Sequence, residues 1–252
     1  MFKTVLCSTL ALVAGSAVVA YADAKDDATA AAKKLADAQN YSWKQTVENA
    51  GGGGGGGRGG FGNMEGKTEK DGVTMFAIQR GDNTMQIFRK GDKVVMQNRD
   101  GEWMTGEEMA AAAAANGNGG AAGRRGGRGG PGAGPLPAEA AQDLIAKSKD
   151  LTSADGVITG QLTDEGIKAF IAGGRGRRGG GGGGNGPDVT NGKGTVKIWT
   201  KDGALSKYEY HLTGTVSRGG NDVDVDRTTT VEINDVGNTK IEVPEAAAKK
   251  LG

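Results

Sequence analysis

The stretch VTMFAIQRGDNTMQIFRKGDKVVMQNRDGEW, residues 73–103, decides the fold class of this 252-residue chain. Its Val-, Ile-, Phe- and Met-rich runs predict strands at 73–80, 84–90 and 93–99, and turn dipeptides separate them at 81–82, 91–92 and 100–101. Strands punctuated by turn signals roughly every 8–12 residues are typical of an antiparallel meander. Apolar and polar residues alternate within the runs, as in Met85, Gln86 and Ile87, so one face of the sheet is predicted to be buried and the other wetter.

Helices are predicted before and after this meander in the sequence. An alanine-rich helix at 27–39 and a strand at 41–47 precede it, and helices at 107–115 and 137–149 follow. A short strand at 156–162 leads to Thr163, which caps a helix that buries Ile167, Phe170 and Ile171.

The C-terminal part of the sequence returns to strands. Asp202-Gly203 predicts a hairpin between strands at 195–201 and 204–216, with Tyr208, Tyr210 and Leu212 on one face. Further strands are expected at 223–234 and 239–243, and Pro244 opens a closing helix. The fold class is therefore α+β with an antiparallel sheet.

Residues 1–22 form a predicted signal peptide, which implies export to the periplasm or cell envelope. Lys3 precedes an uncharged, mostly apolar run at 5–19, and Ala20-Tyr21-Ala22 supplies the small-x-small cleavage pattern, with cleavage after Ala24 as the alternative. The run is too short to span a bilayer. The only cysteine, Cys7, lies in this segment, so residues 23–252 are expected to lack disulfides. The length that remains without the signal peptide and the low-complexity tracts suits a single domain at 23–252.

Three low-complexity tracts at 51–62, 116–134 and 173–186 hold ten glycines each, out of 48 in the chain. We expect disordered, solvated loops there. Residues 23–252 contain 30 basic and 30 acidic residues, and the tracts hold seven of the basic and none of the acidic ones, so they carry +7 and the remainder −7. The tract arginines that could contact an anionic partner are Arg58, Arg124, Arg125, Arg128, Arg175, Arg177 and Arg178.

The order of these elements resembles the LolA/LolB superfamily of bacterial envelope proteins, which includes lipoprotein carriers. The resemblance rests on Tyr41-Ser42-Trp43, the meander with Gly91-Asp92 and Asp100–Trp103, the strand at 195–199 and the Thr-rich strand that ends at Pro244. It implies an unclosed antiparallel β half-barrel with covering helices, into which the three tracts are inserted. It also implies binding of acyl chains or other hydrophobic ligands.

Methionines recur about once per predicted strand in the meander. We expect a row of apolar side chains that lines a ligand cavity: Met75, Met85, Ile87, Met96 and Met104. Flexible, polarizable methionine suits a cavity that adapts to varied lipid tails. Two alternatives are gap-filling in a packed core and copper binding through thioethers, although the tight methionine clusters and added histidines expected of a copper site are missing.

The sequence carries no signature of catalysis. His211 is the only histidine, which excludes a metal site built on several histidines, and no pair of carboxylates is marked out as an acid and a base. The Asp222–Asp226 run lacks the glycine of a calcium loop, and alternation places its aspartates on a solvated face. We therefore expect a non-enzymatic protein without a cofactor.

Two function classes remain. The first is an exported protein that binds a hydrophobic ligand, a lipid or a lipidated protein in a half-barrel cavity. The second is a structural or adhesive envelope protein whose Arg/Gly tracts contact anionic polymers or surfaces. Export disfavours nucleic acid as the partner of the tracts.

Overall fold

The computed structural model describes residues 21–50, 63–70, 72–80, 83–98, 100–115, 134–171, 188–218 and 221–252. Residues 1–20 of the predicted signal peptide and the three tracts, apart from Gly134, lie outside these ranges. The predictions of a leader, of disordered loops and of a single domain therefore stay predictions.

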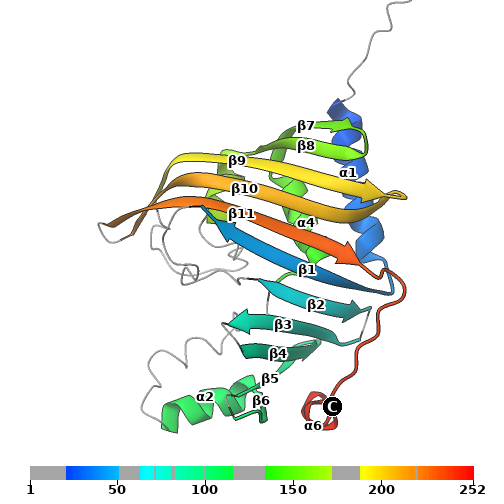
Figure 1. Cartoon of the computed structure of the whole chain (residues 1–252), viewed down its shortest axis with the longest axis vertical. Helices are drawn as coiled ribbons and strands as arrows, with labels where there is room; N and C mark the ends of the chain where they lie inside the picture. Colours follow the sequence, from blue (N-terminus) through cyan, green and yellow to red (C-terminus); the bar gives the residue numbers. More distant parts are fainter. Residues whose placement is uncertain are drawn as a thin grey trace, which may run out of the picture.

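One open antiparallel sheet of eleven strands organises the described residues, in the order β6-β5-β4-β3-β2-β1-β11-β10-β9-β8-β7 (Figure 1). The first meander comprises β1 (Asn40–Asn49), β2 (Met64–Glu69), β3 (Thr74–Arg80), β4 (Asn83–Lys90), β5 (Lys93–Gln97) and β6 (Trp103–Thr105). The second comprises β7 (Ser148–Ala154), β8 (Val157–Leu162), β9 (Asp188–Lys201), β10 (Ala204–Arg218) and β11 (Asn221–Asn234). Pairing of β1 with β11 joins the two, with Trp43 opposite Ile233.

Three helices cover one face of the sheet, which we call the inner face. Figure 1 shows α1 (Tyr21–Ala36) and α4 (Pro137–Ala146) behind the second meander. Helix α1 packs on β7, β9 and β10, and the third helix, α5 (Asp164–Ile171), packs on β8, β9 and β10. Ala28, Ala32 and Leu212 in this region are completely buried at 0 % exposure, so this half of the inner face is a closed core.

A smaller core lies on the opposite, outer face of the first meander. The C-terminal helix α6 (Glu245–Leu251) packs Ala247 and Leu251 against Phe88 and Val95. Phe88 also lies 5.3 Å from the Trp103 ring, centroid to centroid. α2 (Gly106–Ala115) is tied to α6 by an ion pair between Lys250 Nζ and Glu108 Oε2 at 2.5 Å. Among the described residues, no helix combines the length and apolar character needed to cross a membrane.

The predicted fold class, an α+β half-barrel with an unclosed antiparallel sheet and covering helices, is confirmed. Thr163 caps α5 as expected, since its hydroxyl accepts a hydrogen bond from the Gly166 amide at 3.1 Å. The hairpin at Asp202-Gly203 is also confirmed, with φ angles of 52° and 71° that favour glycine in the second position.

Several boundaries differ from the sequence-based expectations. The first helix begins at Tyr21 and ends at Ala36 instead of spanning 27–39, and Ala24 joins its buried face. The helix predicted at 137–149 ends at Ala146, and the next residues form the unpredicted strand β7, whose sequence SKDLTSA lacks an apolar alternation.

The strand predicted at 239–243 is wrong. This segment crosses the ends of β1 and β2 instead of pairing along a strand. The Thr239 amide donates to Asn40 Oδ1 at 2.7 Å and the Ile241 amide to Glu69 Oε1 at 3.1 Å. Side-chain oxygens thus satisfy backbone donors that would otherwise pair in a sheet.

Candidate functional site

Two cross-strand rows of mostly apolar side chains run over the inner face of the first meander. Antiparallel register aligns both rows, and the members of each row are partners of one another in adjacent strands. The first row is Trp43, Gly66, Phe76, Ile87, Met96 and Met104. The second row is Gln45, Met64, Ile78 and Met85.

Four of the five predicted cavity residues lie in these rows. Ile87 and Met96 are buried in the first row, Met104 is half-buried at its end, and Met85 is half-buried in the second row. Register also brings in Met64, which was not among the predicted cavity residues. The signal that could have identified it is its place opposite Ile78 once β2 is paired with β3.

Met75 lies on the outer face. Its cross-strand partner is Phe88, and it packs against the small core under α6. The reason is strand geometry, because successive residues point to opposite faces and Phe76 and Ile78 occupy the inner one. The structure therefore does not bring Met75 together with the other four.

Aromatic rings form the wall of the first row where it meets β1. The Trp43 ring lies 5.8 Å from Tyr41 and 5.8 Å from Phe76, and the second pair is edge-to-face. Gly66 makes room for the indole, since a Cβ at that position would come within 2.1 Å of Trp43 Cζ2. The position of the Trp43 ring therefore depends on the absence of a side chain at Gly66.

A polar margin borders the rows on the side where β1 begins. Arg89 donates to the Gly134 carbonyl at 3.1 Å and its guanidinium lies 5.4 Å from the Phe76 ring centre. Burial lowers the pKa of Arg89, while the charge of Glu139 acts in the opposite direction. Burial raises the pKa of the Tyr41 hydroxyl to about 12, so this margin keeps a neutral phenol beside a cation.

The opposite margin of the inner face lies under the last turn of α5. Phe170 and Tyr210 contact each other there, with ring centres 5.3 Å apart. Arg227 of β11 reaches this turn and donates from Nη2 to the Phe170 carbonyl at 2.7 Å. Burial raises the pKa of the neighbouring Tyr208 hydroxyl well above its usual value. Both ends of the inner face thus combine an arginine with aromatic rings.

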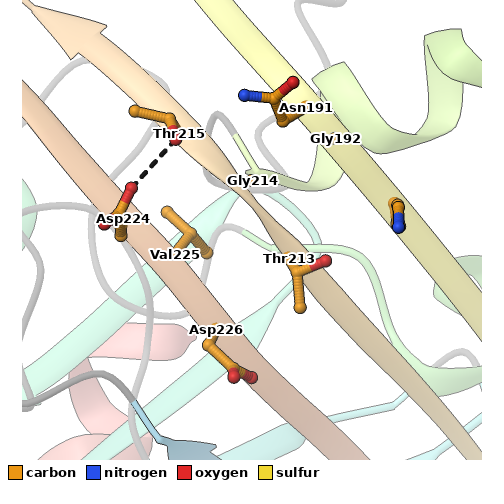
Figure 2. Close-up of a pocket in the computed structure, with 9 residues that line it drawn as sticks. Asn191, Gly192, Thr213, Gly214, Thr215, Asp224, Val225 and Asp226 are labelled. Carbon is orange, nitrogen blue, oxygen red and sulfur yellow. Dashed lines mark hydrogen bonds between the residues drawn. The ribbon is translucent and has the colours of Figure 1, made fainter.

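A separate open hollow of ≈ 620 Å³ lies near the start of β9, the end of β10 and the start of β11, around Gly192 and Gly214 (Figure 2). Asp224 accepts a hydrogen bond from Thr215 at 2.9 Å, and Asp226 lies 2.8 Å from His211 Nε2. Asp224 and Asp226, which were predicted to lie on a solvated face, and His211 therefore each have a polar partner within the sheet. Within the described ranges, no group of three or more His, Cys, Asp or Glu side chains is placed to hold a metal ion.

All seven tract arginines, from Arg58 to Arg178, lie outside the described residues. The structure therefore gives no position for the predicted anionic contacts, and these stay predictions.

Comparison of the sequence with protein-family models and with curated proteins finds no match. Among solved structures, the chain is similar to the Mycobacterium tuberculosis lipoprotein LppX, with a TM-score of 0.46, 10 % identity, and coverage of 88 % of this chain and 99 % of that one. It is also similar to LprF from Mycobacterium bovis, with a TM-score of 0.43, 9 % identity, and coverage of 90 % and 98 %. These values describe a distant likeness in chain path, and membership of the LolA/LolB superfamily stays a prediction.

Proposed function

We propose that this protein is an exported, non-enzymatic carrier that binds an acyl chain or a lipidated partner on the inner face of its first meander. The observation that supports the proposal is the pair of cross-strand rows, in which half-buried methionines continue the sheet face beyond the closed alanine and leucine core. The proposal includes removal of residues 1–22 and a mature domain at 23–252.

Methionine suits such a face for a physical reason. Its unbranched thioether side chain has three rotatable bonds, so it can follow ligands of different shape at small cost. Met64, Met85 and Met104 keep part of their surface accessible, whereas their neighbour Ile87 on the same face is completely buried at 0 % exposure. A buried, fixed residue beside partly accessible, flexible methionines favours hydrophobic ligands of varied chain length over a single rigid molecule.

A matched pair of substitutions tests the proposal. Met85 and Met75 are both half-buried and lie on adjacent strands, but they face opposite sides of the sheet. Met85→Gln should weaken binding of a fluorescent fatty acid about fivefold or more, since an amide left against an apolar chain costs roughly 1 kcal/mol or more. Met75→Gln should leave binding unchanged.

Lipid extraction and native mass spectrometry of the purified mature protein complete this test. Co-purifying lipid in the wild type and less lipid in Met85→Gln support a ligand face. Equal effects of the two substitutions on binding, or no bound lipid and no affinity for the fluorescent probe, would reject it. Denaturant unfolding of both variants separates loss of binding from loss of the fold.

A second function is motivated by the segregated charge of the sequence, +7 on the tracts against −7 on the remaining residues from Asp23 onward. Tract arginines would then attach the protein to anionic polymers of the envelope. Deletion of all three tracts should abolish salt-dependent binding to dextran sulfate and leave fatty-acid binding intact. Polymer binding that survives the deletion would contradict this second function.

A further inference from the structure

Arg227 projects onto the inner face from the interior of a strand. Along β11 it shares this face with Thr229 and Val231, both of which are buried. Its cross-strand partners are Leu212 of β10 and Asn49 of β1. The side chain therefore extends from the sheet toward α5, where Nη2 meets the Phe170 carbonyl at 2.7 Å.

The contact with α5 explains how the guanidinium is held. Phe170 lies in the last turn of the helix, where carbonyl groups lack intrahelical partners and a cation is favoured. This bond uses one N–H of the five that a guanidinium offers. The cation is thus oriented by the backbone, and among the described residues this is the one hydrogen bond found for its guanidinium.

The Nε atom of Arg227 is buried and has no hydrogen-bond partner in the described part of the chain. The neighbouring Asp226 lies on the other face of β11, where its carboxylate contacts His211. None of the ion pairs found among the described residues includes Arg227. A buried donor on a charged group without a partner is rare in folded proteins and calls for an oxygen ligand.

The arginine at the other margin differs in this respect. Arg89 donates to Gly134 and feels the charge of the Glu139 carboxylate. Its charge is therefore balanced in part by the chain itself. Of these two arginines, Arg227 is the one with a buried nitrogen that has no hydrogen-bond partner among the described residues.

We infer that Arg227 is the head-group residue of the inner-face site, and this inference rests on the function proposed above. The guanidinium of Arg227, a half-buried residue, binds an oxygen of a carboxylate or phosphate head, while the apolar tail lies against the methionine rows. Asn49, opposite Arg227, follows Gln45 of the second row by four residues along β1. That spacing corresponds to about 13 Å, within the length of a long acyl chain.

The experiment compares amphiphiles that share a tail and differ in their heads. Oleate, oleyl alcohol and oleyl phosphate are titrated into the full mature protein, with inorganic phosphate as a tail-free probe. The wild type should bind oleate or oleyl phosphate about tenfold or more tightly than the alcohol, because hydrogen bonds to charged groups are the stronger ones. The preferred anion identifies the head as a fatty carboxylate or a phosphate ester.

Substitutions then assign the preference to Arg227. Arg227→Gln should abolish it without changing alcohol affinity, and Arg227→Lys should retain part of it, since an ammonium keeps the charge but lacks the planar fork. Lys193→Gln, which removes one charge from an exposed position, should behave like the wild type. Circular dichroism and unfolding of each variant verify that the fold is kept.

The outcomes separate the inference from the proposed function. A wild type that binds alcohol and anions equally, or a preference that survives Arg227→Gln, would overturn the role of Arg227 while hydrophobic binding stands. Failure of all the amphiphiles to bind would overturn the proposed function together with this inference. Binding of inorganic phosphate as tight as that of oleyl phosphate would overturn the inference as well, because the methionine rows would then contribute nothing.

Discussion

Replacement of Gly66 by alanine should destabilise the protein, although alanine is ordinarily the more stable residue in a strand. On backbone grounds the change is favourable, since glycine in a strand interior is roughly 0.5–1 kcal/mol less stable than alanine. The new Cβ, however, would lie 2.1 Å, 2.4 Å and 2.5 Å from Cζ2, Cε2 and Cη2 of Trp43. Atoms cannot approach so closely, so the indole has to move.

The size of the effect follows from where the indole can go. Trp43 is 3 % exposed and has Tyr41 and Phe76 as ring neighbours at 5.8 Å, so little free space surrounds it. Overpacking of a well-filled core costs about 1–3 kcal/mol, and complete loss of a buried tryptophan about 3–5 kcal/mol. After the backbone gain is subtracted, these figures give about 0–2.5 and about 2–4.5 kcal/mol, and we expect the free energy of unfolding to fall by about 2 kcal/mol, where the two ranges meet.

Denaturant unfolding measures this loss, and a double-mutant cycle assigns it to the Trp43 contact. All three close atoms belong to the six-membered ring of the indole, so Trp43→Phe removes the outer part of the clash. In that background Gly66→Ala should cost less than about 1 kcal/mol, which gives a coupling energy well above the error of the cycle.

Gly106 provides the matched control, because a Cβ there meets nothing within 4 Å. Gly106→Ala should change stability by less than about 1 kcal/mol, in the stabilising direction. Equal effects of the two alanine substitutions, or a Gly66→Ala cost that persists in full in the Trp43→Phe background, would refute the reasoning about the aromatic wall.

Three further outcomes are expected. Leu251→Ala should lower the free energy of unfolding by roughly 2–4 kcal/mol, because Leu251 is 4 % exposed in the outer core; Lys249→Ala, at an exposed ion pair, should cost less than about 0.5 kcal/mol in the same denaturant assay. Burial raises the pKa of Tyr41 from 10.0 to about 12, so the unfolded chain loses this proton first and stability should fall as the pH rises from 10.0 toward 12. Tyr41→Phe should remove that part of the alkaline loss in unfolding experiments, and an unchanged loss would contradict the assignment. Mass spectrometry of the exported protein should find Asp23 as the first residue, because cleavage after Ala24 would remove a side chain that is 1 % exposed in the core; a mature chain that begins at Lys25 would contradict this expectation.

Strands with strong local signals could be predicted from the sequence, because local chemistry determines them. Alternation in residues 84–90 and the turn at Asp202-Gly203 specify their structure within a few neighbouring residues. β7 and the segment 239–243 depend on tertiary contacts instead. β7 holds one buried leucine, Leu151, and relies on pairing with β8. Ile241 has the sequence pattern of a strand residue, but its amide donates a hydrogen bond to the Glu69 side chain. No local pattern reveals this contact.

The candidate site was predictable only in part, for a related reason. Spacing along the chain indicates that methionines recur once per strand, but register decides which face each one joins. Met75 could have been excluded from the alternation with Phe76, whereas Met64 could be included only after β2 was paired. Arg227 carried no sequence signal at all, because its importance comes from contacts with a helix 57 residues away in the chain.

The two meanders contribute to binding in different ways, and this follows from their packing. A ligand between the helices and the second meander would have to displace Ala28, Ala32 and Leu212, which are at 0 % exposure, and would therefore open a complete core. Half-buried Met64 and Met85 in the first meander can change rotamer without such a loss. Arg227 lies on β11, which joins the two meanders, and its guanidinium is fixed to α5 of the closed half. A head group bound there is held by the rigid part of the protein, while the tail meets the adaptable part. Affinity should then depend on the head-group chemistry more than on tail length, and a series of fatty acids of increasing length with a constant carboxylate should show a shallow dependence in the wild type.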